Sequence, residues 1–487
     1  MPRHRAPAPA LLVSLDPAQP TPLYRQLYAA LRRSILEGGL GPGTRLPSTR
    51  VIAFELGISR NTVVLAFDQL MAEGYLTGAP RSGTRVAAAL PLPGRTRPTG
   101  TTRPSAGLSS RGRSLAGLRA RTSAKGGTEP RPFRAGVPAL DEFPRELWAR
   151  LTARRWRRPP MLGYGEIAGY GPLREAIAEY VRAGRGARCS PDQIIVVSGS
   201  QQGIDLAARL LLDPGDVVWM EEPGYAGARI ALSAAGATLV PVTVDAEGLV
   251  VERGRMVAPR ARMAYVSPSH QYPLGVTMSA PRRLDLLRWA TEAGSWVLED
   301  DYDSEFRYDA RPLGCLQGMD DGGRVVYIGT FSKTMVPALR LGYLIVPEPL
   351  VDAFMAARAA ADRHSPTLEQ AVLADFVAEG HFARHVRRMR RLYAERQQVL
   401  VAAVREELRD RVEIAPSPAG MHLVAWLRPG EDDQQVSASA LQAGVEASPL
   451  SWYAESRLER GGLVLGWAAY PPDQIRRAVA MLATVLR

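Results

Sequence analysis

Lys333 is the residue of this sequence best suited to covalent chemistry. The chain has 61 lysines and arginines, but only Lys125 and Lys333 are lysines. A primary amine can form an imine with a carbonyl compound, whereas the guanidinium of arginine stays protonated and cannot. Lys125 lies in a stretch rich in Gly, Ser and Arg, while Lys333 closely follows the apolar run 325–328. A genome that encodes arginine by default would also leave few lysines, but the place of Lys333 favours a functional amine.

Three further segments could hold a small planar ligand with a phosphate. Ser198–Gln202 follows an apolar run and opens a helical pattern, so its backbone N–H groups and hydroxyls could bind a phosphate. Glu299–Asp303 offers a carboxylate that could keep a pyridine nitrogen protonated, and a phenol beside it. Glu221–Tyr225 ends on an aromatic ring that could stack on the ligand. Each segment alone is also typical of an ordinary loop or helix cap, but together with Lys333 they indicate pyridoxal phosphate chemistry.

Alternating elements are predicted to bring these segments together. The apolar runs lie at 193–197, 217–220, 264–266, 296–298 and 325–328, and helical patterns such as 203–212 separate them. Near-continuous apolar strands with helices between them predict an α/β fold with a mostly parallel sheet. In such sheets ligands bind at the carboxyl ends of the strands, which is where the polar segments lie.

Length and composition set further limits. A chain of 487 residues exceeds what one core supports, so at least two domains are expected. No apolar run is long enough for a membrane span, and the N-terminus is too short for a secretory signal, so we expect a cytoplasmic protein. Two cysteines and six scattered histidines predict no disulfide framework and no metal site. The net charge of +12 favours a polyanionic partner, although an arginine-rich proteome would produce the same excess.

Residues 15–88 are patterned as a small helical domain. Apolar residues recur every four positions from Leu23 to Ile35, and two more helices are predicted after the N-cap candidates Ser48 and Ser59. A glycine turn between two helices, with polar residues on the first turn of the second, is typical of a helix-turn-helix. The segments 75–76 and 83–86, around the turn 79–82, predict a two-stranded wing.

Residues 89–131 are dominated by Pro, Gly, Ser, Thr and Arg and predict a flexible linker to a third region, 132–487.

The first region resembles the winged helix-turn-helix domain of the GntR family. The resemblance rests on LPSTR, LGISRNTVVLAFDQLMAEGYL and RSGT, which occur in the family's order. It implies that the partner is double-stranded operator DNA. The implied DNA contacts are Arg50, Arg60, Asn61, Thr62 and Thr84. A three-helix protein-interaction module is the alternative.

Residues 132–487 resemble the fold-type I aminotransferases in the order and spacing of the four segments above. These enzymes bind pyridoxal 5′-phosphate (PLP). The resemblance makes Lys333 the catalytic residue that forms the internal aldimine and pairs Asp300 with the pyridine nitrogen. It also brings Tyr302 to the ring hydroxyl and stacks Tyr225 on the ring.

The same resemblance implies a phosphate site and a second subunit. The residues expected around the phosphate are Gly199, Ser200, Gln201, Thr330, Ser332 and Arg340. Tyr164 matches the tyrosine that reaches the phosphate of the neighbouring subunit, which implies a homodimer.

Two departures from true aminotransferases are visible. Where those enzymes have Asn-Pro-x-Gly, this chain has Tyr272-Pro273-Leu274-Gly275, so the asparagine that contacts the ring hydroxyl is missing and His270 or Gln271 could replace it at the cofactor. The strand that normally carries the arginine for the substrate carboxylate reads 463–467, LVLGW, and Arg457 and Arg460 just before it fit a solvated turn better.

A GntR-like head, a long linker and an aminotransferase-like body are the arrangement of the MocR regulators, which SPSHQYPLG and EDDYDSEFRY also resemble. The resemblance implies a PLP-dependent transcription factor that senses PLP, or an amino compound through PLP, and that could control vitamin B6 synthesis. With the clamp arginine missing, we expect weak or no transaminase activity and favour the cofactor as the signal. The alternative is an active aminotransferase with a residual DNA-binding head.

Overall fold

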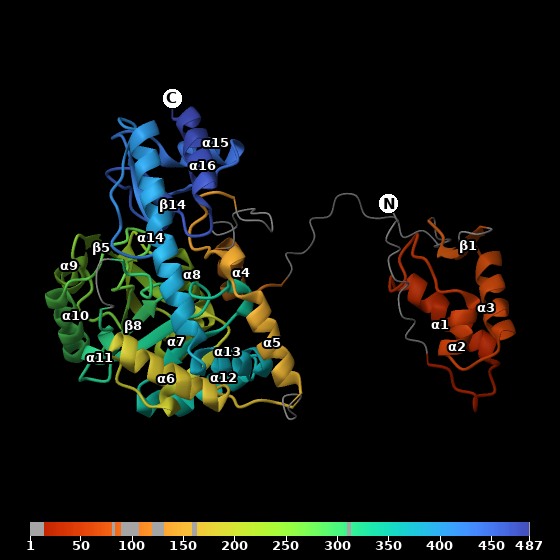
Figure 1. The fold of residues 1–487 in the computed structure, drawn as a ribbon. Coiled ribbons are helices and arrows are strands. Elements are labelled where there is room, and N and C mark those ends of the chain that lie inside the picture. The colour runs from red at the N-terminus through yellow and green to blue at the C-terminus, as the bar shows by residue number, and fades with distance from the viewer. Residues whose placement is uncertain are drawn as a thin grey trace. The chain divides into compact units, whose positions relative to one another are not determined.

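The computed structural model describes residues 14–79, 83–88, 107–118, 131–157, 163–308 and 313–486. The chain divides into two compact units, residues 1–106 and 107–487 (Figure 1). Lys125, the tip of the expected wing turn and most of the expected linker lie outside the described residues. In the part of the chain that is described, none of the helices has the length and apolar character needed to cross a bilayer.

The first unit is a three-helix domain with a two-stranded wing. Its elements are α1 (Leu23–Leu36), α2 (Thr49–Glu55), α3 (Arg60–Ala72), β1 (Leu76–Ala79) and β2 (Gly83–Val86), with the two strands antiparallel. The apolar face of α1, including Leu27 and Leu31, packs against Phe67 and other buried residues of α3. The hydroxyls of Ser48 and Ser59 accept hydrogen bonds from backbone N–H groups of α2 and α3, as predicted from their positions.

A short helix lies inside the stretch that composition predicted to be an extended linker. This helix, α4 (Ser110–Leu118), belongs to the second unit and contacts α8 (Ala226–Ala235). The guanidinium of Arg111 donates a 2.7 Å hydrogen bond to the carbonyl oxygen of Ala234 near the end of α8. Part of the expected linker therefore belongs to the second unit.

An eight-stranded sheet forms the centre of the second unit. Its order is β3-β10-β9-β8-β7-β4-β5-β6, and the neighbours from β9 to β5 are parallel, while β10 and β6 are antiparallel to their partners. The strands are β3 (Ile194–Val197), β4 (Val217–Glu222), β5 (Thr238–Asp245), β6 (Gly248–Leu249), β7 (Met263–Val266), β8 (Trp296–Asp301), β9 (Val325–Thr330) and β10 (Gly342–Ile345). The predicted α/β fold with a mostly parallel sheet is confirmed.

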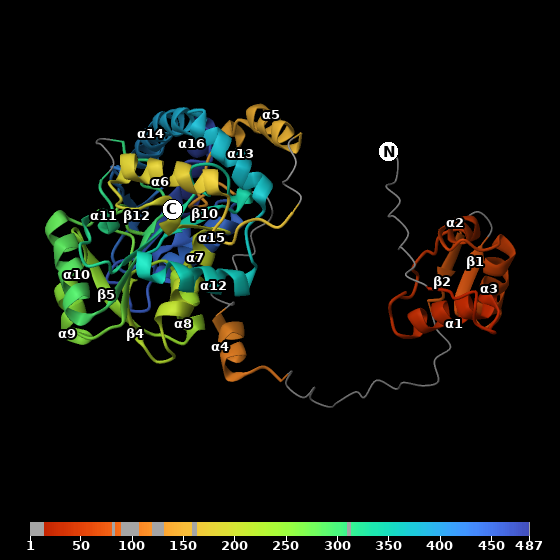
Figure 2. The same cartoon turned by 90° about the horizontal axis from the view of Figure 1, so that it is seen from below.

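Helices cover both faces of this sheet (Figure 2). Side chains of β9 alternate between the faces: Val326 and Ile328 pack with α7, α8 and α12, whereas Val325 packs with α10 and Tyr327 with α6 and α13. These helices are α6 (Gly171–Arg185), α7 (Ser200–Leu211), α10 (Ala280–Ala293), α12 (Val351–Ala361) and α13 (Thr367–Ala378). Further helices of this part are α5 (Arg145–Trp156), α9 (Val251–Val257) and α11 (Leu316–Met319).

A smaller layered region follows the large sheet. The long helix α14 (His381–Glu407) leads to a four-stranded sheet in the order β11-β12-β14-β13, which packs with α14 and α16 around Phe133 and Trp467. The elements are β11 (Val412–Glu413), β12 (His422–Leu427), α15 (Asp433–Gln442), β13 (Ser448–Pro449), β14 (Gly462–Gly466) and α16 (Pro472–Val485). The start of β12 brings His422 back to the carboxyl ends of the large parallel strands, where the polar segments gather.

Candidate functional site

One cavity of about 310 Å³ brings together nine of the residues that the sequence predicted. These are Ser200, Gln201, Tyr225, Asp300, Tyr302, Thr330, Ser332, Lys333 and Arg340. Eight further residues complete its wall: Ala135, Gly136, Tyr265, Tyr272, Asp303, Pro337, Met421 and His422. The cavity lies at the carboxyl ends of β8 and β9, where a parallel sheet is expected to bind ligands.

Lys333 lies three residues beyond β9, and its amine faces a backbone carbonyl. The Nζ atom donates a 2.7 Å hydrogen bond to the carbonyl oxygen of Gly136. Burial lowers the pKa of Lys333, and the carboxylates of Asp303 and Asp300 act in the opposite direction. A lowered pKa increases the share of neutral amine, which is the nucleophilic form.

Asp300 at the end of β8 has one oxygen that lacks a partner. Its Oδ2 accepts a 2.6 Å hydrogen bond from the hydroxyl of Tyr265, whereas its Oδ1 is buried with no hydrogen bond. Burial raises the pKa of Asp300 to about 6. A buried carboxylate oxygen without a donor fits a protonated pyridine nitrogen, which would supply both a hydrogen bond and a compensating charge.

Hydroxyls, a guanidinium and a helix N-terminus form the part of the cavity that suits a phosphate. The side chains of Ser200, Thr330 and Ser332 line it, and Ser200 is the first residue of α7. The guanidinium of Arg340 donates a 2.8 Å hydrogen bond to the carbonyl oxygen of Ser198. Gly199 is not itself on the wall, but a Cβ there would lie 3.1 Å from Nη2 of Arg340, so glycine makes this approach possible. These groups fit a phosphate dianion.

Tyr225 forms a flat wall of the cavity. The residue precedes α8, and its hydroxyl is 3.4 Å from the amide oxygen of Gln201. Its ring lies so close to Gly227 that a Cβ there would be 2.4 Å from the ring carbon that bears the hydroxyl. Burial raises the pKa of Tyr225 to about 12, so the side chain stays a neutral phenol available for stacking.

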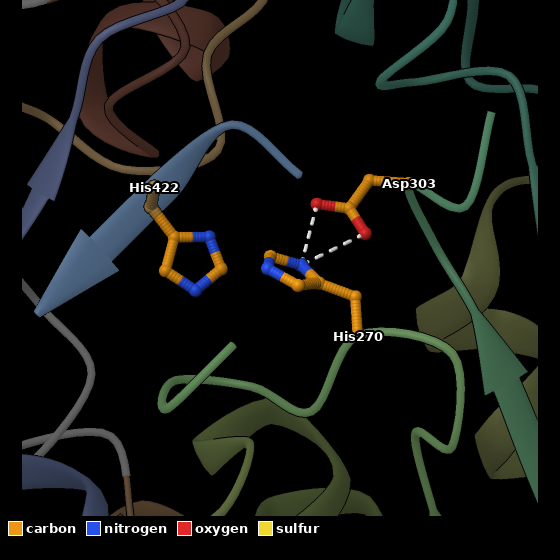
Figure 3. A group of neighbouring side chains, drawn as sticks. All are labelled: His270, Asp303 and His422. Atoms are coloured by element: carbon orange, nitrogen blue, oxygen red, sulfur yellow. Dashed lines mark hydrogen bonds and ion pairs between the residues drawn. The ribbon is translucent and has the colours of Figure 1, made fainter. Parts of the chain in front are cut away.

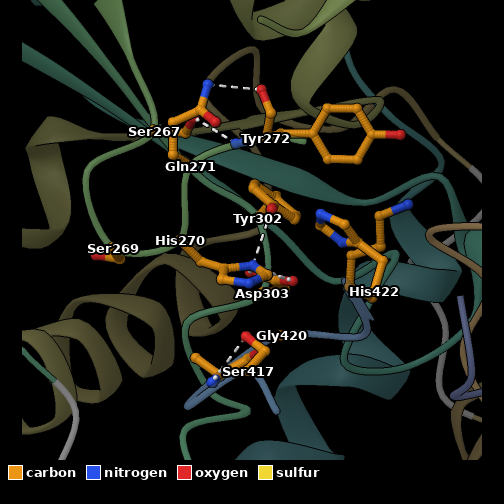
Figure 4. A network of polar contacts seen from close by, with 12 residues as sticks. Ser267, Ser269, His270, Gln271, Tyr272, Tyr302, Asp303, Ser417, Gly420 and His422 are labelled. Atoms are coloured by element: carbon orange, nitrogen blue, oxygen red, sulfur yellow. Dashed lines mark hydrogen bonds and ion pairs between the residues drawn. The ribbon is translucent and has the colours of Figure 1, made fainter. Parts of the chain in front are cut away.

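His270 and Gln271, the two expected substitutes for the asparagine, lie differently from that expectation (Figure 4). Neither residue lines the cavity. Nδ1 of His270 is 3.0 Å from the hydroxyl oxygen of Tyr302, so His270 lies behind Tyr302. The side-chain amide of Gln271 donates to the carboxylate of Glu221 and to backbone carbonyls. Any contact of His270 with a ligand ring would therefore run through Tyr302.

His270, Asp303 and His422 form a buried group of side chains whose ligand atoms lie within 4.8 Å of one another (Figure 3). Nδ1 of His270 is 3.1 and 3.2 Å from the two oxygens of Asp303. Nε2 of His422 is 3.2 Å from the carbonyl oxygen of Pro273, and burial lowers the pKa of His422 well below its usual value. The sequence did not predict this group, because its members come from three loops and strand ends with no metal-ligand spacing.

Tyr164 lies outside the cavity of its own chain. It is 84% exposed, with the guanidinium carbon of Arg363 4.7 Å from its ring centre and the ring of His364 edge-on to it. It is not among the residues that line the cavity.

The strand β14, which the sequence comparison with aminotransferases led us to expect at the carboxylate clamp, carries apolar side chains. Val464 in β14 packs with Val424 and Leu450. Arg457 is exposed, and Arg460 pairs with Glu413 at 2.7 Å. Among the described residues that line the cavity, the cationic side chains are Lys333 and Arg340.

The expected DNA-contacting residues lie on the first unit. Arg50, Arg60 and Asn61 are exposed on α2 and α3, whereas Thr62 and Thr84 are partly buried. The hydroxyl of Thr62 is 2.8 Å from that of Ser59, so it takes part in the helix cap. The strand β2 also carries the exposed Arg85, a basic residue that the sequence reasoning did not single out.

Two family models match the chain. The model for aminotransferases of class I and II matches residues 138–482. The model for bacterial regulatory proteins of the gntR family matches residues 23–86.

Curated relatives match this chain over nearly the full length of both proteins. The probable rhizopine catabolism regulatory protein MocR of Rhizobium meliloti is 44% identical over 475 residues, which cover 97% of this chain and 95% of that protein. The pyridoxine biosynthesis transcriptional regulator PdxR of Corynebacterium glutamicum is 30% identical, with coverages of 97% and 98%.

Solved structures resemble the second unit. Kynurenine aminotransferase of Pyrococcus horikoshii has a TM-score of 0.68 and 28% identity, covering 78% of this chain and 94% of that one. Alpha-aminoadipate aminotransferase of Thermus thermophilus, solved with N-(5′-phosphopyridoxyl)-L-leucine, has a TM-score of 0.68 and 29% identity, with coverages of 78% and 95%.

Proposed function

Since this chain belongs to the MocR-type regulators of the gntR family, we propose that it is a transcription factor whose body reports the state of bound PLP to operator DNA. The observation that carries the proposal is the cavity in which the amine of Lys333 and the unpartnered Oδ1 of Asp300 occur together. A chain that also carries a gntR-type head can use such a site to regulate DNA binding.

The residues of the cavity would each hold one part of the cofactor. PLP, when bound, supplies an aldehyde for an amine and a ring that withdraws electrons. Lys333 would bind at the aldehyde carbon, and Oδ1 of Asp300 would accept the proton of the pyridine nitrogen. Tyr225 would stack on the ring. Around the phosphate, Ser200, Thr330, Ser332 and Arg340 would donate hydrogen bonds, together with the N-terminus of α7.

The effector is either PLP itself or an amino compound that reacts with it. The apolar cluster around Val464 offers no partner for a carboxylate, which supports an effector other than an ordinary amino acid. Two relatives are named for the processes that they regulate, one for pyridoxine biosynthesis and one, as probable, for rhizopine catabolism. We favour PLP as the signal and genes of vitamin B6 synthesis as a target.

The working unit would be a homodimer in the cytoplasm, where operator DNA is found. The exposed ring of Tyr164, which does not reach its own cavity, supports a contact with the phosphate in a second copy of the chain. The proposed organisation is a DNA-binding head at 15–88, a linker at 89–131 that includes α4, and an effector body at 132–487.

A second function, a working aminotransferase, is favoured by Lys333 and by the position of Asp300. The apolar residues at the clamp position oppose it, because a substrate held without its carboxylate would be poorly oriented for proton removal.

The two functions can be separated with purified apo and PLP-loaded protein and a DNA fragment from upstream of its own gene. A regulator should bind the fragment with an affinity that changes when PLP is added. The Lys333→Ala variant should still bind the fragment, but its affinity should not respond to PLP. Equal binding by both forms would exclude PLP as the signal. Rapid multiple turnover with an amino donor would favour the enzyme.

A further inference from the structure

Tyr302, His270 and Asp303 form a hydrogen-bonded chain that ends at the cavity wall (Figure 4). Tyr302 and Asp303 follow β8 directly and line the cavity, whereas His270 comes from the loop after β7. The side chains of His270 and Asp303 are each only 1% exposed. Water therefore cannot satisfy these groups, and the direction of each hydrogen bond follows from the others.

The carboxylate of Asp303 determines which nitrogen of His270 carries a proton. Both oxygens of Asp303 lie near Nδ1, at 3.1 and 3.2 Å. A bare Nδ1 would direct its lone pair at a carboxylate, which is repulsive, so Nδ1 carries the proton in this arrangement. The opposite nitrogen, Nε2, is buried without a hydrogen-bond partner, so the polar contacts of this ring are those of Nδ1 with Asp303 and Tyr302.

The proton on Nδ1 then determines how the hydroxyl of Tyr302 is oriented. The Tyr302 oxygen lies 3.0 Å from Nδ1 and can only accept from it, so its own proton must point elsewhere. Since Tyr302 lines the cavity, that proton is free to point into it. Other titratable groups also lie near these side chains. The ring centres of His270 and His422 are 5.0 Å apart, and Tyr272, Asp300 and Glu221 act on Tyr302.

Glycine at position 420 allows this arrangement. Gly420 has a φ of +82°, and a Cβ there would lie 1.9 Å from the carbon between the two ring nitrogens of His270. A side chain at this position would displace the imidazole from Asp303 and Tyr302. The backbone after α14 is therefore shaped around the ring of His270.

We propose that Asp303 and His270 are positioning residues that hold the Tyr302 hydroxyl as a hydrogen-bond donor into the cavity, toward the ring oxygen of the bound cofactor. They would do indirectly what the missing asparagine does by direct contact. The proposal rests on PLP binding in this cavity. A metal centre is the other use of His270, Asp303 and His422, whose ligand atoms lie within 4.8 Å of one another, so Zn²⁺ binding is one outcome of the test.

The test uses the visible band of the PLP-loaded full-length protein, followed against pH. At low pH the Lys333 nitrogen bound to the cofactor would carry a proton, and this N–H would share the negative charge of the cofactor's ring oxygen. At high pH that N–H is lost, so a donor from Tyr302 stabilises the high-pH form most. Loss of the donor should raise the midpoint of the titration. We expect Tyr302→Phe to raise it, and His270→Phe to raise it by about 0.5–1 pH unit.

Three further variants distinguish a positioning role of His270 from a general effect of its substitution. His270→Asn, whose amide keeps an N–H near the place of Nδ1, should restore most of the wild-type midpoint. The double variant Tyr302→Phe/His270→Phe should match Tyr302→Phe alone, because His270 acts through Tyr302. The matched control His381→Phe, on α14 outside the cavity, should leave the midpoint unchanged.

Several outcomes would overturn the proposal. Additive shifts in the double variant, or an unchanged midpoint in a folded His270→Phe protein with Tyr302→Phe shifted, would mean that His270 does not act through Tyr302. Saturable Zn²⁺ binding that His422→Ala abolishes would identify the group as a metal site. A wild-type protein without a visible band would instead refute PLP binding itself, which keeps the two failures distinct.

Discussion

Asp300 and Tyr265 share one hydrogen bond of 2.6 Å, and this bond uses only one of the two carboxylate oxygens of Asp300. The other oxygen, Oδ1, is buried and unpartnered. A carboxylate in this state is costly in the protein without its cofactor, because burial disfavours its charge and one of its oxygens has no donor. Asp300 therefore lowers the stability of the cofactor-free protein.

The first prediction is that Asp300→Asn stabilises the cofactor-free protein. Burial raises the pKa of Asp300 to about 6. Between its ordinary pKa of about 4 and pH 6 the folded protein keeps a proton that the unfolded chain has lost, so stability falls as pH rises through this window. At pH 8 we expect the variant to be more stable by about 1–3 kcal/mol, with the difference shrinking toward pH 4.

Chemical denaturation of both proteins at pH 4, 6 and 8 measures this difference. The same substitution should weaken PLP binding, because Asn carries no charge for the pyridinium. Tyr265→Phe is a matched control, since it removes the other hydrogen bond and should raise rather than relieve the cost. A variant that is no more stable than wild type at pH 8 contradicts the prediction.

The second prediction is that Lys333 is the residue that binds PLP covalently. Lys333→Ala should abolish the visible band of the purified protein, and Lys333→Arg should do the same because the guanidinium cannot form an imine. Lys125→Ala is the control and should keep the band. Borohydride reduction and peptide mapping measure this directly, and an adduct at any residue other than Lys333 would contradict the assignment.

The third prediction is that Arg60→Ala weakens operator binding without changing the cofactor spectrum, because Arg60 lies on α3 of the first unit. A phosphate contact should lower the log–log salt slope by about 1, and a guanine contact should cost about 1–3 kcal/mol at one base pair. Arg476→Ala, an exposed arginine on α16 of the second unit, is the control for loss of positive charge. Unchanged affinity across a range of salt concentrations would remove Arg60 from the DNA contacts.

The fourth prediction is that common amino acids convert bound PLP to its amino form slowly or not at all. The cavity has no cation beyond Lys333 and Arg340 among its described lining residues, and Val464, in the strand expected to carry the clamp, lies in an apolar cluster. The visible spectrum of the loaded protein, mixed with a panel of amino acids and keto acids, measures the conversion. DNA binding should respond more to PLP than to any member of the panel. Fast conversion with one donor would show that the carboxylate is held in another way.

The fold could be predicted from the sequence because apolar runs and helix caps are local patterns. The runs that end at Leu298 and Ile328 identified β8 and β9, but both strands continue, to Asp301 and Thr330. Backbone hydrogen bonds in a parallel ladder do not depend on side-chain polarity. The first polar residue after an apolar run therefore indicates a candidate functional residue, but it does not indicate where the strand ends.

Contacts between segments that are far apart in the chain could not be predicted from the sequence. His270 and Asp303 are 33 positions apart, and His422 reaches the carbonyl of Pro273 across 149 positions. No periodicity links such residues, so the sequence predicted His270 at the cofactor itself rather than behind Tyr302. Gly136 was missed for the same reason, because its contribution is a backbone carbonyl and not a side chain.

The hydrogen bond from Lys333 to Gly136 makes the beginning of the body sensitive to the chemical state of the amine. A free ammonium has three N–H donors, whereas a nitrogen joined to a cofactor keeps at most one. Gly136 is close to the N-terminal end of the body, and nearby Phe133 pairs with Gly466 of β14. A covalent bond between Lys333 and the cofactor would therefore leave at most one N–H donor for this backbone carbonyl, at the point where the chain enters the body.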